Sequence, residues 1–250
     1  MRNVWTIARR EYSRFFSSPI AYVVAFVILL VLGIMFSLTI LVYMQAAFNG
    51  QLGNSAPDVS GITGTFTFLF VLAIPALTMR LVSDENRMGT MELLLTAPVR
   101  DWELIVGKWL GGFLFILTII LVSVIYPLIL NAMESPGIDQ MQMVISYLGV
   151  ILVAASFLAL GVGISALFTN QIAAFFVTLV LFIILWWMIS FAAQYVTGGA
   201  DLFNYLNMQH HFYDSLNTGV ISLADIAYFL SLIALGLFTG TAAVEARRWS

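Results

Sequence analysis

The chain has 250 residues, of which 61% are hydrophobic and 9% are charged. A soluble domain carries roughly 25% charged residues, so this composition excludes a water-soluble globular protein and predicts an integral membrane protein. The absence of cysteine excludes disulfides, thiol catalysis and thiolate metal sites. The net charge of −3 says little about function, because in a membrane protein the position of each charge matters more than the sum.

Long runs without Asp, Glu, Lys or Arg predict the membrane spans, since a helix needs about 20 apolar residues to cross roughly 30 Å of hydrocarbon. Ser18 and Pro19 are suited to begin the first span, and Pro75 interrupts the second. The predicted fold is an all-α membrane protein, a single transmembrane domain over residues 1–250. Its six spans are expected at residues 20–44, 63–79, 109–133, 143–168, 172–196 and 226–244.

All ten basic residues fall on one predicted side of the membrane. They precede the first span, separate the second from the third, or follow the sixth: Arg2, Arg9, Arg10, Arg14, Arg80, Arg87, Arg100, Lys108, Arg247 and Arg248. The opposite loops hold acidic residues but no basic one: Asp58, Glu134, Asp139, Asp201 and Asp214. The positive-inside rule therefore predicts a multi-pass protein of the cytoplasmic membrane with both termini in the cytoplasm.

Residues 1–18 mix aromatic and aliphatic side chains with four arginines. This composition predicts an amphipathic interfacial helix that lies in the membrane surface with its basic residues toward anionic headgroups. The alternative is that the arginines only enforce the orientation of the first span, and both can hold together.

Residues 83–108, SDENRMGTMELLLTAPVRDWELIVGK, form a loop too long for a simple turn. Gly89 breaks the chain, residues 91–95 favour a short helix, and Pro98 ends it. Asp101 and Glu103 suit the first turn of the third span, where carboxylates oppose the helix dipole. Leucines exposed on the short helix would form a docking surface. The alternative is that they fold back onto the membrane surface.

Three segments resemble a known family. The stretch SDENRMGTMELLLTAPVRDWELIVGKWLGG resembles the cytoplasmic loop of ABC-2 family permeases, in which an acidic-basic pair precedes Gly-Thr, Glu, a leucine run and Pro. The opening REYSRFFSSPIAY is similar to the family's interfacial helix and first span. The stretch HHFYDSLNTGVISLADIAYFL resembles the subgroup of gliding-motility-associated permeases and of the permease for nitrous oxide reductase maturation.

The resemblance implies that two permease domains, identical or different, pair with two separate ATPase subunits. It also implies that the loop between the second and third spans carries a coupling helix that seats on the ATPase. The coupling residues carried over are Glu85, Arg87, Gly89, Thr90, Glu92, Leu94, Leu95 and Pro98. The alternative for each is plain loop structure, with Glu85 and Arg87 as a solvated ion pair that contributes little.

The chain lacks the phosphate-binding pattern G-x-x-x-x-G-K-[ST], because its one Gly-Lys, at Gly107 and Lys108, is followed by Trp109. We therefore expect no catalytic residue, cofactor or metal in this chain, with ATP and Mg²⁺ on the partner ATPase. Further expected partners are the lipid bilayer, the second permease and an accessory extracytoplasmic subunit, but no nucleic acid.

A few residues inside or beside the spans invite a specific role. Gly161 and Gly163 allow close helix approach, either within one subunit or at a dimer interface. His210 and His211 suggest a metal site, which is disfavoured because adjacent histidines cannot both face one ion from a regular helix or strand. Asp225 is expected to cap the sixth span.

The spans carry no charge well inside them, which disfavours an ion-coupled secondary transporter. An intramembrane enzyme is also disfavoured, because no nucleophile with its base can be assembled. The expected function is a permease subunit of an ATP-driven transporter that works by alternating access. The alternatives are a channel or uniporter, and a membrane scaffold that anchors an ATPase without transport.

Overall fold

The computed structural model describes residues 2–49, 59–88, 99–133, 137–195 and 200–248. Every regular element in these ranges is a helix. The longer ones are α1 (Arg2–Phe15), α2 (Pro19–Phe48), α3 (Ser60–Thr78), α6 (Asp101–Ser123), α7 (Ile125–Met133), α8 (Gln140–Leu167), α9 (Gln171–Ile183) and α12 (Leu223–Arg248). The shorter ones are α4 (Ser83–Arg87), the π-helical turn η1 (Ile184–Met188), α10 (Ile189–Tyr195), α11 (Ala200–Leu206), the π-helical turn η2 (His210–Ser215) and the 3₁₀ turn η3 (Leu216–Thr218).

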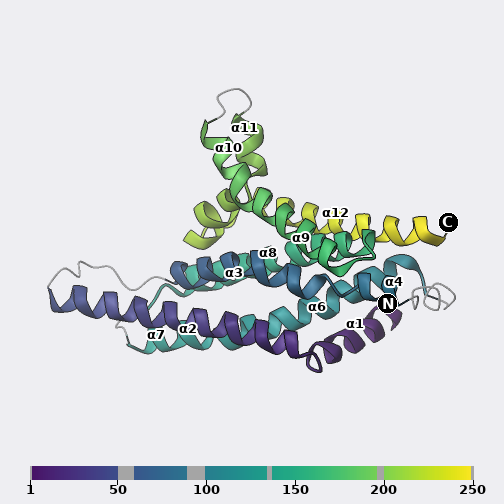
Figure 1. Cartoon of the computed structure of the whole chain (residues 1–250). Helices are drawn as coiled ribbons and strands as arrows, with labels where there is room; N and C mark the ends of the chain where they lie inside the picture. The colour runs from purple at the N-terminus through teal and green to yellow at the C-terminus, as the bar shows by residue number, and fades with distance from the viewer. Residues whose placement is uncertain (1, 50–58, 89–98, 134–136, 196–199, 249–250) are drawn as a thin grey trace.

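The prediction of an all-α membrane fold with six spans is confirmed. Six helical stretches are long and apolar enough to cross a membrane: Pro19–Ala46, Ser60–Glu85, Asp101–Met133, Gln140–Leu167, Gln171–Tyr195 and Leu223–Arg248. Both ends of the chain lie at the same end of the bundle, as an even number of spans requires (Figure 1).

The third stretch begins earlier than the sequence predicts. Helix α6 starts at Asp101, before the expected span and inside the segment expected to be loop, but Asp101 and Glu103 lie in its first turn as predicted. The Glu103 carboxylate accepts a hydrogen bond of 3.1 Å from the backbone N–H of Arg100. Lys108, which the sequence places at the end of the loop, is fully buried within this helix. A charged residue therefore does not mark the helix boundary here.

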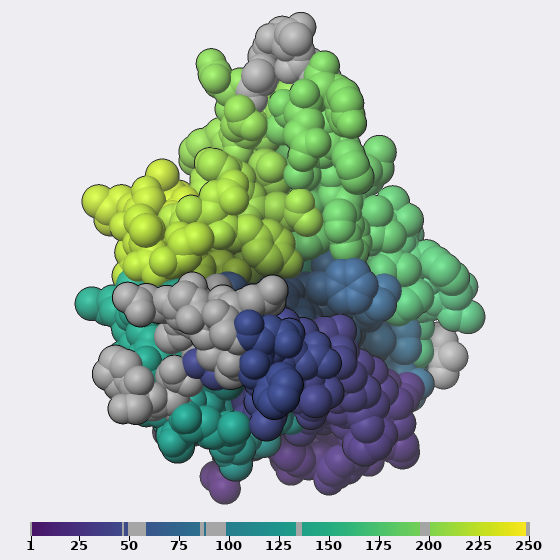
Figure 2. Space-filling view, turned by 90° about the vertical axis from the view of Figure 1, so that its left-hand side faces the viewer, coloured from purple at the N-terminus to yellow at the C-terminus, as the bar shows by residue number. Residues whose placement is uncertain are grey.

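Helices α3 and α8 form the centre of the bundle. Figure 1 shows them between α2 and α6 on one side and α9 and α12 on the other. In α8, 78% of the most apolar window is buried, against 11% in α2. Seen from the end away from the termini, α2 lies on the outside and the chain from α9 to α11 projects to one side (Figure 2). Helix α2 thus presents most of its apolar surface to the surroundings, as lipid contact requires.

Small residues of α8 pack inside the chain. A Cβ added at Gly163 would lie 2.6 Å from the carbonyl oxygen of Gly236, and one at Gly236 would lie 2.4 Å from the carbonyl carbon of Ala159. A Cβ at Gly161 would lie 2.5 Å from Oγ1 of Thr78. These glycines let α12 and α3 approach the backbone of α8, so packing within one subunit accounts for Gly161 and Gly163.

Helices α10 and α11 pack against each other and project from the bundle as a hairpin (Figure 1). Trp186 of η1 is buried at the base of the hairpin, with its ring centroid 6.0 Å from that of Phe157 and 5.8 Å from that of Tyr213. The chain then returns through η2 and η3 to the start of α12.

Candidate functional site

Lys108 of α6 is fully buried, and its ammonium group has three acceptors around it. Its Nζ lies 2.8 Å from Oε1 of Glu85, 3.3 Å from Oε1 of Glu11 and 2.6 Å from the carbonyl oxygen of Leu81. These three contacts match the three N–H donors of a lysine. Such complete pairing is required, because desolvation costs several kcal/mol for each buried ion.

The two carboxylates are also buried and come from different helices. Glu11 belongs to α1 and Glu85 to α4, and their relative exposures are 2% and 4%. Two exposed arginines lie further out: Nη1 of Arg14 is 4.0 Å from Oε2 of Glu11, and Nη2 of Arg10 is 4.0 Å from Oε1 of Glu85. We call Lys108, Glu11 and Glu85 the lysine cluster. It joins three elements that are separate in the sequence.

Helix α1 reaches the lysine cluster because its inner face packs on α6. Ala8, Glu11 and Phe15 are its buried residues, and their helical spacing places Glu11 on the apolar face. Two glycines of α6, one turn apart, permit the contact. A Cβ at Gly111 would lie 2.6 Å from Cβ of Glu11, and one at Gly107 would lie 2.8 Å from a side-chain carbon of Ile7.

Further contacts fasten α1 along α6. The rings of Phe15 and Phe115 stack with centroids 4.9 Å apart. The hydroxyl oxygens of Tyr12 and Thr118 are 3.1 Å apart and hydrogen-bonded. Helix α1 is therefore bound along its length to the first half of the third span.

The segment at the start of α4 is also hydrogen-bonded to α8 and α9. The backbone N–H groups of Val82 and Ser83 each donate to Oγ of Ser165 in α8, at 3.2 Å. The side-chain amide of Gln171, at the start of α9, donates to the carboxylate of Asp84. Helix α4 thus connects α1, α6, α8 and α9 at one end of the bundle.

A second buried polar cluster lies at the opposite end. Nδ1 of His211 is 2.7 Å from Oδ1 of Asp225, and Nε2 is 2.8 Å from the carbonyl oxygen of Tyr205. The hydroxyl of Ser215 donates to the other oxygen of Asp225, and the His211 ring stacks on Tyr228 with centroids 4.2 Å apart. We call His211, Asp225 and Ser215 the histidine cluster.

Asp225 does not cap α12, so that expectation is wrong. Its carboxylate is engaged by His211 and Ser215, whereas Oγ of Ser222 accepts from the backbone N–H of Ala224 at 3.2 Å. The neighbouring His210 contacts a different carboxylate, that of Asp214, with Nδ1 2.7 Å from Oδ2. Within the part of the chain that the structure describes, no group of three or more His, Asp or Glu residues is arranged to hold a metal ion.

Comparison with known proteins identifies the family. Residues 5–245 match the family described as ABC-2 family transporter protein. The chain belongs to the ABC-2 family. It is 32% identical over 127 residues to the probable ABC transporter permease protein NosY of Stutzerimonas stutzeri, a match that covers 49% of this chain and 43% of that protein. It is 34% identical over 112 residues to the protein of the same description from Pseudomonas aeruginosa, which covers 43% of this chain and 38% of that protein. The chain thus matches less than half the length of either relative, and the resemblance found in the sequence is confirmed.

The structure describes only some of the coupling residues that the resemblance to ABC-2 permeases predicts. Glu85 is buried in the lysine cluster, so it is not part of a solvated pair. The backbone of Arg87 ends α4, and its side chain lies outside the described residues. The remaining predicted residues also lie outside them: Gly89, Thr90, Glu92, Leu94, Leu95 and Pro98.

Sequence reasoning missed Glu11 and Lys108 as members of this ABC-2 chain's buried cluster. Two signals were present. Glu11 is the one acidic residue among four arginines in residues 1–18, and helical spacing places it beside Ala8 and Phe15. Lys108 interrupts an apolar run, LIVGKWLGG, which indicates a charge inside a helix rather than at its end.

Proposed function

We propose that the chain is the membrane-spanning permease subunit of an ATP-driven ABC transporter that works by alternating access. ATP and Mg²⁺ bind to separate ATPase subunits, and a second permease, identical or different, completes the membrane pathway. Membership of the ABC-2 family, the NosY permeases among its relatives and the six spans support this proposal. The lack of a phosphate-binding loop in the sequence supports hydrolysis on another chain.

The lysine cluster is the observation that carries the mechanism. Helix α4 leads directly into residues 89–98, within which the proposal places the coupling helix at residues 91–95. Through Glu85, Lys108 and Glu11, helix α4 is bound to the third span and to α1. A displacement imposed by the ATPase would then move these elements together.

The penalty for separating the charges of the lysine cluster is comparable with the free energy that the proposed mechanism needs. Shifting a two-state element from 1:99 to 99:1 requires about 5.5 kcal/mol of differential binding. Removing one partner of a buried ion pair typically costs roughly 3–5 kcal/mol. That cost arises because the remaining charge is buried without a partner, so α4 is expected to move together with Lys108 and not away from it, whereas an exposed ion pair of about 0–1 kcal/mol would impose no such constraint.

The coupling assignment is tested by charge placed in the docking surface. In this proposal Leu94 and Leu95 fill a groove on the ATPase, where burial of each contributes roughly 1.5–3 kcal/mol. The Leu94→Asp, Leu95→Asp variant should remain monodisperse by size exclusion but lose the co-purifying ATPase. Glu92→Lys should keep the ATPase and weaken stimulated hydrolysis. A well-folded double variant that retains the ATPase at wild-type stoichiometry would contradict the assignment.

The orientation has its own test, for which the cysteine-free chain is well suited. Thr169 and Thr218 are both exposed threonines in turns, one near each end of the bundle. With both termini in the cytoplasm, Thr218→Cys should react with an impermeant maleimide on intact cells, and Thr169→Cys only after permeabilisation. The reverse pattern would overturn the orientation.

Substrate-dependent hydrolysis distinguishes the permease from its alternatives. The purified chain alone should bind no nucleotide, and the complex with its ATPase should hydrolyse ATP in a manner that depends on the transported substrate. Saturable nucleotide binding by the isolated chain would refute the division of labour. A rate of ATP hydrolysis that no ligand of the complex changes would favour the alternative of a membrane scaffold that anchors an ATPase without transport.

A further inference from the structure

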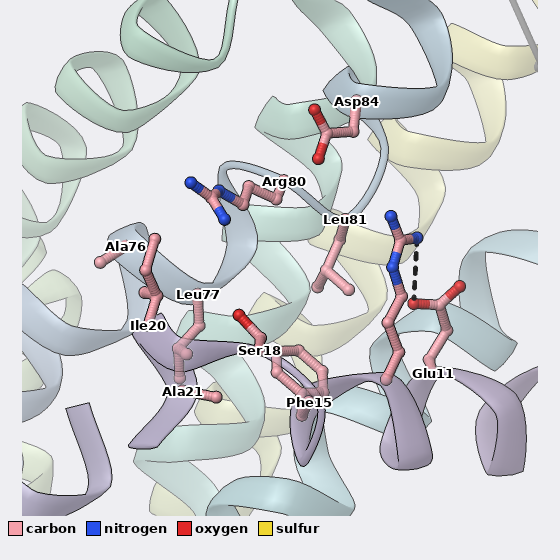
Figure 3. A pocket seen from close by; sticks show the side chains of 11 residues that line it. Glu11, Phe15, Ser18, Ile20, Ala21, Ala76, Leu77, Arg80, Leu81 and Asp84 are labelled. Carbon is pink, nitrogen blue, oxygen red and sulfur yellow. Dashed lines mark ion pairs between the residues drawn. The ribbon is translucent and has the colours of Figure 1, made fainter. Parts of the chain in front are cut away.

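A pocket of about 100 Å³ lies beside the lysine cluster, between the α1–α2 turn and the end of α3. Arg14, Ser18, Arg80 and Asp84 contribute its polar rim, while Phe15 and Leu77 contribute apolar walls. Figure 3 shows Arg80 on one side of the pocket and Glu11, which pairs with Arg14, on the other, with Ser18 beside Phe15 below them. The pocket therefore combines two guanidinium groups, a hydroxyl and an apolar base.

Two guanidinium groups and two carboxylates line the pocket, and they differ in whether they already have partners. Glu11 is engaged by Lys108, and Asp84 accepts from Gln171, so both carboxylates at the pocket have partners. Arg80 is exposed and makes no ion pair with any other residue in the described ranges. Arg14 pairs with Glu11, so the Arg80 guanidinium is the cationic group that remains available at the rim, and a guanidinium with a hydroxyl is a usual set of ligands for a phosphate.

The position of the pocket indicates which kind of phosphate-containing molecule would bind there. Helix α2 begins at Pro19 and runs on as the first membrane span, so the pocket lies where the chain enters the bilayer. The positive end of the α2 dipole also faces it, because Ser18 and Ile20 line the pocket. On its other side Phe15 lines an apolar crevice of about 150 Å³ with Leu29 and Val122. A polar rim that suits a phosphate, next to an apolar crevice, suits a ligand with a phosphate headgroup and an apolar tail.

We propose that this pocket binds the phosphate of a phospholipid headgroup in the leaflet at this end of the bundle. Arg80 contacts the phosphate oxygens, Ser18 donates a hydrogen bond, and the acyl chains lie along α2. The bound lipid contacts both the α1–α2 turn and the end of α3 and stabilises their arrangement. It is a resident ligand and not the transported molecule, so the inference stands apart from the proposed transport.

The test is native mass spectrometry of the purified full chain in detergent, titrated with phosphatidylglycerol. We expect one tightly retained lipid. Arg80→Gln should weaken the apparent Kd by roughly 10- to 100-fold, the equivalent of one charge-assisted hydrogen-bonding group. Arg9→Gln is the matched control, because Arg9 is an exposed arginine of α1 that does not line the pocket. It should leave the Kd unchanged.

Two further ligands decide what the pocket recognises. Diacylglycerol, which lacks the phosphate, should be retained far more weakly, and inorganic phosphate should not displace the lipid. Equal retention of diacylglycerol, displacement by inorganic phosphate, or equal weakening by Arg9→Gln would each overturn the proposal. If Arg80→Gln is not monodisperse, Arg80→Lys decides: we expect weaker binding than wild type, because lysine lacks the planar fork, and unchanged binding would overturn the proposal.

Discussion

The two buried polar clusters stand at opposite ends of the bundle and differ in what they join. In the lysine cluster, Lys108 contacts Glu11 and Glu85 across sequence separations of 97 and 23. In the histidine cluster, His211 contacts Asp225 and Tyr205 across separations of 14 and 6. Lys108, Glu11 and Glu85 are nearly inaccessible to solvent, and so are His211 and Asp225. Only the first connects the segment before residues 89–98 to the third span.

This difference shows that burial of charge does not by itself mark a transmitting site. The histidine cluster closes a short return of the chain from the α10–α11 hairpin to α12, so its loss should loosen that return alone. The lysine cluster ties α1, α4 and α6 together, so its loss should separate elements that the proposed mechanism moves as one. Each of the following variants tests one side of this contrast.

The largest effect is expected from Lys108→Met. The substitution leaves Glu11 and Glu85 buried without their ammonium, at a cost of roughly 3–5 kcal/mol. Thermal inactivation followed by fluorescence-detected size exclusion should show a strong loss of stability. The triple variant Glu11→Gln, Glu85→Gln, Lys108→Met removes all three charges and should recover most of it. A single variant as stable as wild type would contradict the described pairing.

The next effect concerns the approach of α1 to α6. In Gly111→Ala the new methyl would lie 2.6 Å from Cβ of Glu11 and 2.9 Å from the carbonyl oxygen of Ala8. Overpacking of this kind costs roughly 1–3 kcal/mol. Gly61→Ala is the matched control, since a methyl group added at Gly61 would have no neighbouring atom of the described residues within 4 Å. Equal stability of the two variants would show that α1 does not pack on α6 as described.

A comparable loss of stability, but no loss of coupling, is expected from His211→Ala. The substitution leaves the buried Asp225 carboxylate and the Tyr205 carbonyl without the imidazole that contacts them, at roughly 1–3 kcal/mol for an unsatisfied group. The folded fraction should still bind the ATPase and stimulate hydrolysis normally. If folded His211→Ala lost stimulation while keeping the ATPase, both clusters would take part in transmission and the contrast would fail.

The smallest effect is expected from Arg10→Gln. Its guanidinium lies 4.0 Å from Glu85 and is 66% exposed, so the pair contributes about 0–1 kcal/mol at most. Melting temperature and stimulated hydrolysis should both stay near wild type. A loss as large as that of Lys108→Met would place the working contact at the rim and not at the buried lysine.

The spans could be predicted from the sequence because their signal is local. A long apolar run by itself predicts a membrane span, and the basic residues predict which helix ends lie on the same side of the membrane. The acidic residues Asp101 and Glu103 indicate the start of α6, but the burial of Lys108 could not be predicted, because a lysine usually marks the end of a span, whereas the charge of Lys108 is satisfied inside the bundle by Glu11 and Glu85. That pairing depends on three segments that meet only in the fold.

The packing of α8 shows the same limit. The sequence identifies Gly161 and Gly163 as places of close approach but does not say which helix approaches. Their partners, Thr78 and Gly236, belong to α3 and α12. Likewise the sequence places Asp225 at the start of a helix, where a capping role is the usual one, while the fold brings His211 onto its carboxylate.

The central claim is that the lysine cluster carries motion from the ATPase side to the far end of the spans. The most direct measurement is the nucleotide dependence of maleimide labelling at Thr218→Cys, in the complex with its ATPase. With the wild-type cluster, ATP should change the labelling rate. With the triple variant Glu11→Gln, Glu85→Gln, Lys108→Met, the ATPase should remain bound and ATP should leave the rate unchanged. The same ATP-induced change in both proteins would contradict the account.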